Sequence, residues 1–310
     1  MTGASVSWTR LAVLSDVHGN LQALQAVEAD LDDWQPDAVI VNGDMVNRGP
    51  DGVAVMERIV ARGWPMVLGN HDDLVVMWTD RSERLPAGWF DDPFWRATGW
   101  CADKLDASGW TDTFRSLPYT REVASQAGRI LISHGSPRHY REGYGPHLDD
   151  AVLSEIVTMH PYDVLVGSHT HQPHERRYGS HVFLNSGSVG TPFNGDPRAQ
   201  YLRLEREADA WQPTFAQVPY DRAAALAVYA TSGYLAEGGL TARIFMLELA
   251  MARSFLVPFL MWAEKRDLVT NEVSWHTFAA ERLQEVAAPD EVGRQAAYDT
   301  GLLRSLTERA

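Results

Sequence analysis

The sequence predicts an α/β fold in which helices cover the faces of sheets, followed by a helical region without strands. Three observations predict it. Short runs of β-branched residues alternate with amphipathic helical stretches over the first two thirds of the chain. Polar clusters that contain glycine follow five of these runs. The strand pattern stops near Pro219, so we expect an α/β domain over residues 1–218 and a helical region over 219–310.

Six short apolar runs have the length and the residue types of buried strands. They are residues 10–14, 38–41, 65–68, 129–132, 163–166 and 181–184. Apolar residues at helical spacing lie between some of these runs. They predict helices over residues 20–34, 53–60 and 148–159. This alternation is typical of sheets covered by helices.

The segment from 78 to 110 is rich in tryptophan, aspartate, proline and glycine. We interpret it as a helical or loop excursion whose indoles pack onto the domain, in preference to an aromatic binding platform. Beyond Pro219 the apolar spacing is helical throughout. It predicts helices over residues 221–230, 241–264, 274–287 and 291–306.

Composition narrows the classes of function. The net charge of −14 and the pI of about 5.2 disfavour a nucleic-acid partner and leave a small anionic substrate open. Cys101 is the single cysteine, so we expect a reducing compartment. The apolar stretch 244–262 contains Glu248, Arg253 and Pro258, which argues against a membrane span. With no signal-peptide pattern at the N-terminus, we expect a soluble, cytoplasmic protein.

Polar clusters follow five predicted strands, and each contains glycine. They are residues 15–19, 42–44, 69–72, 133–136 and 167–171. Ligands of α/β folds bind at the carboxyl ends of strands, so these clusters are expected to meet at one rim. Each cluster alone has an ordinary explanation, such as a helix cap at Asp16 or a buried structural histidine at His134. Together they supply aspartate, asparagine and histidine, the mixed ligand set that suits Mn²⁺, Fe, Zn²⁺ or Ni²⁺.

The order of these motifs resembles that of the calcineurin-like metallophosphoesterases. The motifs are Asp-x-His at 16–18, Gly-Asp-x-x-x-Arg at 43–48, Gly-Asn-His-Asp at 69–72, His-Gly at 134–135 and His-x-His at 169–171. The resemblance covers roughly residues 10–219 and is strongest to the small bacterial and archaeal phosphodiesterases. It implies a four-layer αββα sandwich of two mixed sheets with flanking helices.

The resemblance also implies a centre of two divalent metal ions, with Mn²⁺ foremost and Fe, Zn²⁺ or Ni²⁺ as alternatives. By this resemblance, the first ion would be held by Asp16, His18, Asp44 and His171, and the second by Asp44, Asn70, His134 and His169. Asp44 would bridge the two ions. A hydroxide that bridges the ions would then attack phosphorus, so no protein nucleophile is required.

Three further residues take roles from the resemblance. His71 would protonate the leaving alkoxide or stabilise a phosphoryl oxygen, and Arg48 would approach the phosphate. Asn47 stands where many protein phosphatases of the family have aspartate. An amide supplies no negative charge, so His71 is expected to be more often neutral at pH 7. Ser168 replaces the glycine that commonly precedes the His-x-His pair.

Several functions fit these motifs. We expect hydrolysis of a phosphodiester or phosphomonoester. Protein Ser/Thr phosphatase and diadenosine-polyphosphate hydrolase are alternatives, the former weakened by Asn47. A nuclease is disfavoured by the acidic charge. An interaction scaffold, like the small subunit of the retromer coat, is the non-enzyme alternative. The helices after Pro219 are expected to cap the site or to form the interface of a homo-oligomer.

Overall fold

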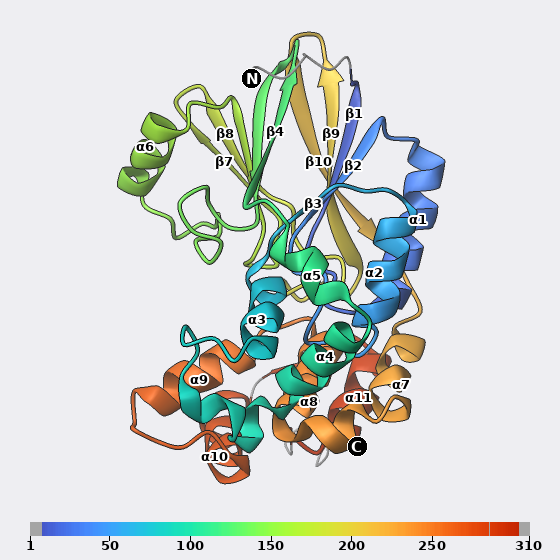
Figure 1. The fold of residues 1–310 in the computed structure, drawn as a ribbon, viewed down its shortest axis with the longest axis vertical. Helices are drawn as coiled ribbons and strands as arrows, with labels where there is room; N and C mark the ends of the chain where they lie inside the picture. Colours follow the sequence, from blue (N-terminus) through green and yellow to red (C-terminus); the bar gives the residue numbers. More distant parts are fainter. Residues whose placement is uncertain (1–7, 285, 304–310) are drawn as a thin grey trace.

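Two five-stranded mixed sheets pack face to face in the computed structural model, which describes residues 8–284 and 286–303 (Figure 1). The first sheet has the order β10 (Ala210–Val218), β9 (Ala199–Glu207), β1 (Arg10–Leu14), β2 (Ala38–Asn42) and β3 (Met66–Val67). The second has the order β4 (Thr120–Ser125), β5 (Gly128–Ser133), β6 (Val164–Gly167), β8 (His181–Asn185) and β7 (His174–Tyr178). In the first sheet β1, β2 and β3 are parallel, and β9 pairs antiparallel with β1. In the second sheet β5, β6 and β8 are parallel, and β4 and β7 pair antiparallel with β5 and β8.

The side chains of β1 show why the predicted strands read as continuous apolar runs. Leu11 and Val13 join the hydrophobic cluster between the two sheets. Ala12 and Leu14 point the other way, into the cluster that contains the flanking helices. Because successive residues of a strand face opposite sides, a strand covered on both faces has no polar positions.

Helices cover the outer faces of the two sheets, which confirms the expected four layers. They are α1 (Leu21–Trp34) and α2 (Gly52–Ala61) on the first sheet and α6 (Asp150–Met159) on the second. All three lie where helical spacing predicts them. Asn20 caps α1, since its side-chain oxygen accepts a hydrogen bond from the Ala23 N–H at 3.1 Å.

Four strands were not predicted from the sequence, namely β4, β7, β9 and β10. β4, β7 and β10 are edge strands, and their sequences carry many polar side chains because one side of each strand lacks a neighbour. β9 alternates apolar and polar residues. The predicted run at 65–68 is also longer than the two residues of β3.

The helical part of the molecule lies below the sandwich in Figure 1. It combines the excursion after β3 with the C-terminal helices. The excursion contains α3 (Asn70–Thr79), η1 (Ala87–Phe90), η2 (Pro93–Trp95), α4 (Arg96–Ala107) and α5 (Trp110–Arg115). The C-terminal helices are α7 (Arg222–Thr231), α8 (Tyr234–Met251), α9 (Leu256–Glu264), α10 (Glu272–Arg282) and α11 (Glu291–Thr300). As expected, most indoles of the excursion pack against the core.

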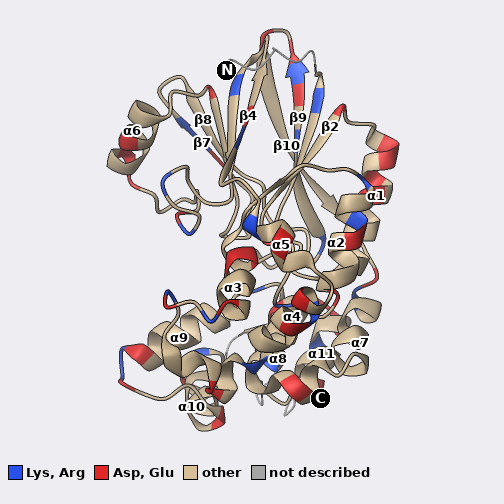
Figure 2. Ribbon diagram, viewed as in Figure 1, with Lys and Arg blue, Asp and Glu red and all other residues tan. Residues whose placement is uncertain are grey.

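The single helix predicted over 241–264 is wrong, because the chain breaks it into α8 and α9. Ala252, which ends α8, has a left-handed backbone with φ of 49°, and Leu256 begins the next helix. Within the described ranges 8–284 and 286–303, no helix has both the length and the apolar character of a membrane span. Lys and Arg are interspersed with Asp and Glu over both the sheets and the helical part (Figure 2).

One hydrophobic cluster runs from the sandwich into the C-terminal helices. It includes Leu24 of α1, Val55 of α2, Leu105 of α4, Leu247 of α8 and Phe259 of α9. The helical region therefore has its apolar core in common with the flanking helices of the first sheet. The division at residues 218 and 219 stays a prediction.

Phe259→Ala is expected to lower the free energy of unfolding by about 3–5 kcal/mol. The ring is fully buried and lies 5.2 Å, centroid to centroid, from Trp275. Urea unfolding followed by tryptophan fluorescence and by circular dichroism measures the change. Val257→Ala, on the same helix at a position that is 48% exposed, should shift stability by less than about 0.5 kcal/mol. A separate transition for the helical region would contradict a shared core.

Candidate metal centre

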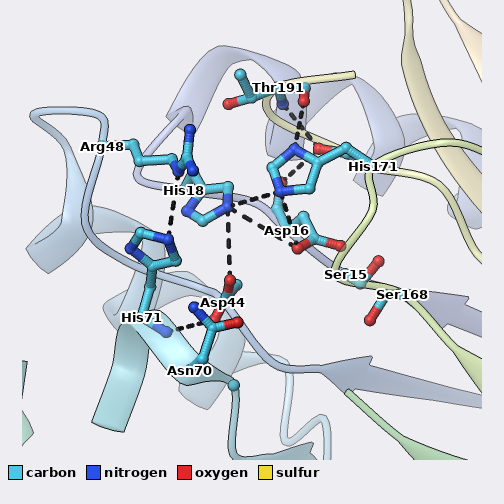
Figure 3. Close-up of polar contacts among 12 residues, drawn as sticks. Ser15, Asp16, His18, Asp44, Arg48, Asn70, His71, Ser168, His171 and Thr191 are labelled. Atoms are coloured by element: carbon cyan, nitrogen blue, oxygen red, sulfur yellow. Dashed lines mark hydrogen bonds and ion pairs between the residues drawn. The ribbon is translucent and has the colours of Figure 1, made fainter. Parts of the chain in front are cut away.

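Five loops at the carboxyl ends of strands meet at one site, part of which is drawn in Figure 3. The loop after β1 carries Asp16 and His18, and it is hydrogen bonded to the loop after β2. The Asp16 N–H donates to the Gly43 carbonyl and the His18 N–H to the Asp44 carbonyl, each at 3.0 Å. The loops after β3, β5 and β6 bring the other histidines and Asn70 to the same place. The structure therefore brings together all ten predicted site residues.

Backbone strain is concentrated in these loops. Twelve described residues other than glycine have left-handed φ angles, and seven of them are predicted site residues. The seven are Asp16, His18, Asp44, Asn47, Arg48, His169 and His171. Such conformations cost about 1–3 kcal/mol each and persist only where surrounding contacts hold them, which is common at functional sites.

Two groups of side chains have the geometry of metal sites. One consists of Asp16, His18 and His171, and the other of Asp44, His134 and His169. Within each group the possible ligand atoms all lie within 4.8 Å of one another. Asn70 adjoins the second group, with its Oδ1 3.2 Å from His134 Nε2. Asp44 lies between the groups, since its Oδ2 is 3.7 Å from His18 Nε2 and 3.2 Å from His134 Nε2.

Backbone carbonyl groups orient three of the imidazole rings. The contacts are His18 Nδ1 with Val46 O at 3.3 Å, His134 Nδ1 with Asn42 O at 2.8 Å and His171 Nδ1 with Thr191 O at 2.5 Å. A carbonyl oxygen can only accept, so each Nδ1 carries a proton. When the ring is neutral, Nε2 then presents a lone pair to the centre. Metal-binding histidines are commonly oriented in this way.

The centre therefore gathers acceptors that face one another. The Nε2 atoms of His18 and His171 are 3.2 Å apart, and His171 Nε2 is 3.2 Å from Asp16 Oδ1. Both carboxylate oxygens of Asp16 and Oδ2 of Asp44 are buried and accept no hydrogen bond among the described residues. Buried acceptors without a donor are costly. Divalent cations would satisfy them, so the donor set fits the implied metal ions.

Burial and charge set the protonation of these histidines. Burial lowers the pKa of His18 well below its usual value and that of His169 to about 4. Burial opposes the charged form of His134 too, but the negative charge of Asp44 raises its pKa to about 10. His18 and His169 are therefore neutral at pH 7, as metal ligands must be.

Asp72 was given no role from the sequence, although it ends the Gly-Asn-His-Asp motif. Its buried carboxylate accepts hydrogen bonds from the N–H groups of Asp44 at 2.8 Å, Met45 at 3.0 Å and Gly69 at 3.0 Å. Asp44 Oδ1 in turn accepts from the His71 N–H at 2.7 Å. Asp72 thus joins the loop after β2 to the start of α3 and holds Asp44 in position.

The three remaining predicted residues form a separate group beside the centre. Asn47 Nδ2 lies 3.1 Å from His71 Nδ1, and Arg48 Nε lies 3.4 Å from His71 Nε2. Asn47 Oδ1 is occupied, because it accepts from the Arg48 N–H at 2.8 Å. The amide of Asn47 therefore donates to His71. Burial lowers the pKa of His71 well below its usual value.

Sequence reasoning also missed Glu248, which it treated only as a charge inside an apolar stretch. The structure places this buried residue of α8 against Arg48, with Nη1 donating to Oε2 at 2.5 Å. A charged residue among apolar neighbours was the one signal available, because such a charge needs a partner.

The sequence matches a known protein family over most of its length. The calcineurin-like phosphoesterase superfamily domain matches residues 10–209. The chain belongs to this superfamily. The match covers every predicted site residue from Asp16 to His171 and ends before the C-terminal helices, so Glu248 lies outside it.

Similar solved structures and curated relatives include bacterial and archaeal proteins. A metallophosphoesterase from Sphaerobacter thermophilus is 26% identical, with a TM-score of 0.58, and covers 75% of this chain and 100% of its own. A hypothetical protein from Pyrococcus horikoshii has the same fold, at 19% identity and a TM-score of 0.63, over 76% of this chain and 97% of its own. Serine/threonine-protein phosphatase 2 of Salmonella typhimurium is 23% identical over 57% of this chain and 86% of its own.

Gly69→Ala is expected to weaken Mn²⁺ binding by the protein about 10–100-fold. A Cβ at Gly69 would lie 2.2 Å from Asp44 Oδ1 and 2.1 Å from the Asp44 nitrogen, so the Asp44 carboxylate must move. Isothermal titration calorimetry measures the affinity. Gly88→Ala is the control, since a Cβ there meets nothing within 4 Å. Unchanged affinity in Gly69→Ala would show that the position of Asp44 does not govern metal binding.

Proposed function

We propose that the chain is a metal-dependent phosphoesterase that hydrolyses a phosphodiester or phosphomonoester. The observation that carries the proposal is the set of buried oxygens of Asp16 and Asp44, which lie 3.2 Å from the Nε2 atoms of His171 and His134 and accept no hydrogen bond among the described residues. Two divalent ions held by these residues would supply the positive charge that the acceptors lack, and they would provide Lewis-acid chemistry for phosphoryl oxygens and for the activation of water.

The ligand assignment follows the position of Asp44 between the two groups. Asp16, His18, Asp44 and His171 would hold one ion, and Asp44, Asn70, His134 and His169 the other. The mixture of carboxylate, amide and imidazole suits Mn²⁺, our first choice, and also Fe, Zn²⁺ or Ni²⁺. Ser168 supports His134 without being a ligand, since its hydroxyl lies 3.1 Å from His134 Nδ1.

His71 is suited to act as a general acid. A neutral imidazole accepts at only one nitrogen, and donors face both nitrogens of His71. The shorter contact is with Asn47, so Nδ1 accepts and the proton resides on Nε2. That proton can be transferred to a leaving alkoxide. Arg48 Nε, 3.4 Å from the ring, then needs another acceptor, and a phosphoryl oxygen is the natural one.

Charge and one curated relative bear on the kind of ester that the protein hydrolyses. The acidic charge favours a small phosphate ester over nucleic acid. The likeness to a Salmonella phosphatase named for serine and threonine residues supports a phosphomonoester as the second candidate, and diadenosine polyphosphates are a third. An interaction scaffold is the non-enzyme alternative. Because Cys101 can form no internal disulfide, we place the protein in the cytoplasm, with the C-terminal helices available for self-association.

The purified protein is expected to hydrolyse bis(4-nitrophenyl) phosphate with Mn²⁺ and to stop when a chelator removes the metal. Asp44→Ala should abolish turnover and reduce the bound metal, because Asp44 adjoins both groups. Nitrophenolate absorbance and elemental analysis measure the two effects. Asp209→Ala, at an exposed turn, is the control. Full activity of Asp44→Ala would refute the proposal, and stoichiometric metal without turnover of mono- or diesters would favour a scaffold.

His71→Ala is expected to retain both metal ions and to lower kcat by about 10²–10⁴-fold. The loss should be larger for an alkyl ester than for a nitrophenyl ester, because nitrophenolate leaves without a proton. Steady-state kinetics with both esters measure the difference, and His276→Ala, an exposed histidine, is the control. Loss of metal from His71→Ala would place His71 among the ligands instead.

A further inference from the structure

Glu248 is a charged residue in an apolar setting. It is fully buried on α8, where Ile244, Leu247 and Met251 are fully buried as well. A buried carboxylate is retained only if hydrogen bonds and an opposite charge compensate for its lost hydration. The contacts of the Glu248 carboxylate therefore indicate its role.

The start of α9 holds one oxygen of Glu248. Oε1 accepts from the N–H groups of Phe255 at 2.7 Å and Leu256 at 2.8 Å. These N–H groups belong to the first turn of α9, where the helix dipole favours a negative charge. The carboxylate is thus fixed by the backbone of the C-terminal region.

The other oxygen holds Arg48. Oε2 accepts from Nη1 at 2.5 Å, and the rings of Phe193 and Phe245 lie 5.6 and 5.2 Å from the guanidinium carbon. Tyr229 of α7 adds a second contact, because its hydroxyl donates to the Arg48 carbonyl at 3.3 Å. Phe193 lies in the loop before β9. Tyr229, Phe245 and Glu248 belong to helices after Val218.

We infer that Glu248 is a positioning residue for Arg48, so that the C-terminal helices complete the phosphoryl-binding side of the site. The inference rests on the proposed function of Arg48. Glu248 accepts from Nη1 of Arg48. Nε of Arg48 lies beside His71 and faces the candidate centre (Figure 3). Among the described residues, the two aromatic rings and the neighbouring His71 are the side-chain contacts of the guanidinium that would remain without this anchor.

Glu248→Gln tests the inference in the full-length, Mn²⁺-loaded protein. The amide oxygen can still accept from Phe255 and Leu256, but the charge that holds Arg48 is lost. Calorimetry with inorganic phosphate should show binding about 10-fold weaker than in the wild type. KM for a phosphate ester should rise by a similar factor with kcat changed less, because Arg48 binds the phosphate before and during the reaction.

Two comparisons separate positioning from a general structural role. In an Arg48→Ala background, Glu248→Gln should weaken phosphate binding no further. Asp290→Asn is the matched control: Asp290 also pairs with a buried arginine, Arg222, and also accepts a backbone N–H, from Gly293 at 2.8 Å. It should leave phosphate binding unchanged. If Glu248→Gln fails to fold, Glu248→Asp, which keeps the charge but shortens its reach, should weaken binding in the same Arg48-dependent way.

The possible results are distinguishable. Tighter phosphate binding in Glu248→Gln would overturn the inference and identify Glu248 as a latch that withholds Arg48. An equal loss with and without Arg48, or phosphate binding that is absent or independent of Arg48, would also overturn it. Phosphate binding that depends on Arg48 and Glu248 in a protein that turns over no ester would support the inference and refute the proposed function.

Discussion

Two buried carboxylates beside the Nε2 atoms of buried histidines impose the constraint on which the rest of the structure depends. Asp16 and Asp44 are almost completely excluded from solvent, and three of their four oxygens accept no hydrogen bond among the described residues. Backbone carbonyls hold the Nδ1 protons of three histidines away from these oxygens. Carboxylate oxygens gathered in this way repel one another, so the surrounding fold must hold them together until cations bind.

The sandwich supplies this restraint through contacts between loops. The parallel strands of both sheets end at the same rim, and the loops that follow are hydrogen bonded to one another through backbone groups. Asp72 and Gly69 show how closely Asp44 is held: Asp72 binds its N–H, and Gly69 leaves no room for a side chain beside it. Strained left-handed residues are tolerated in these loops because so many contacts determine their positions.

The C-terminal helices extend the same restraint to the charged group beside the centre. They are packed into the cluster that also contains α1, α2 and α4, so their position relative to the rim is determined by the core. The position of these helices also determines where Glu248 holds Arg48, a residue 200 positions earlier in the chain. A region outside the family match thus contacts a side chain inside it.

The class of the fold, the buried parallel strands, the three helices that cover the sheets and the loop clusters that meet at the rim were predictable from the pattern of residues. These follow from local rules, because a strand buried on both faces is apolar throughout and strand ends need glycine and polar residues. The strands β4, β7, β9 and β10, the break after Met251, the donor role of Asn47 and the pairing of Glu248 with Arg48 became evident only in the folded molecule. Each of these depends on which distant groups lie within hydrogen-bonding distance, and that is settled by packing between elements far apart in the chain.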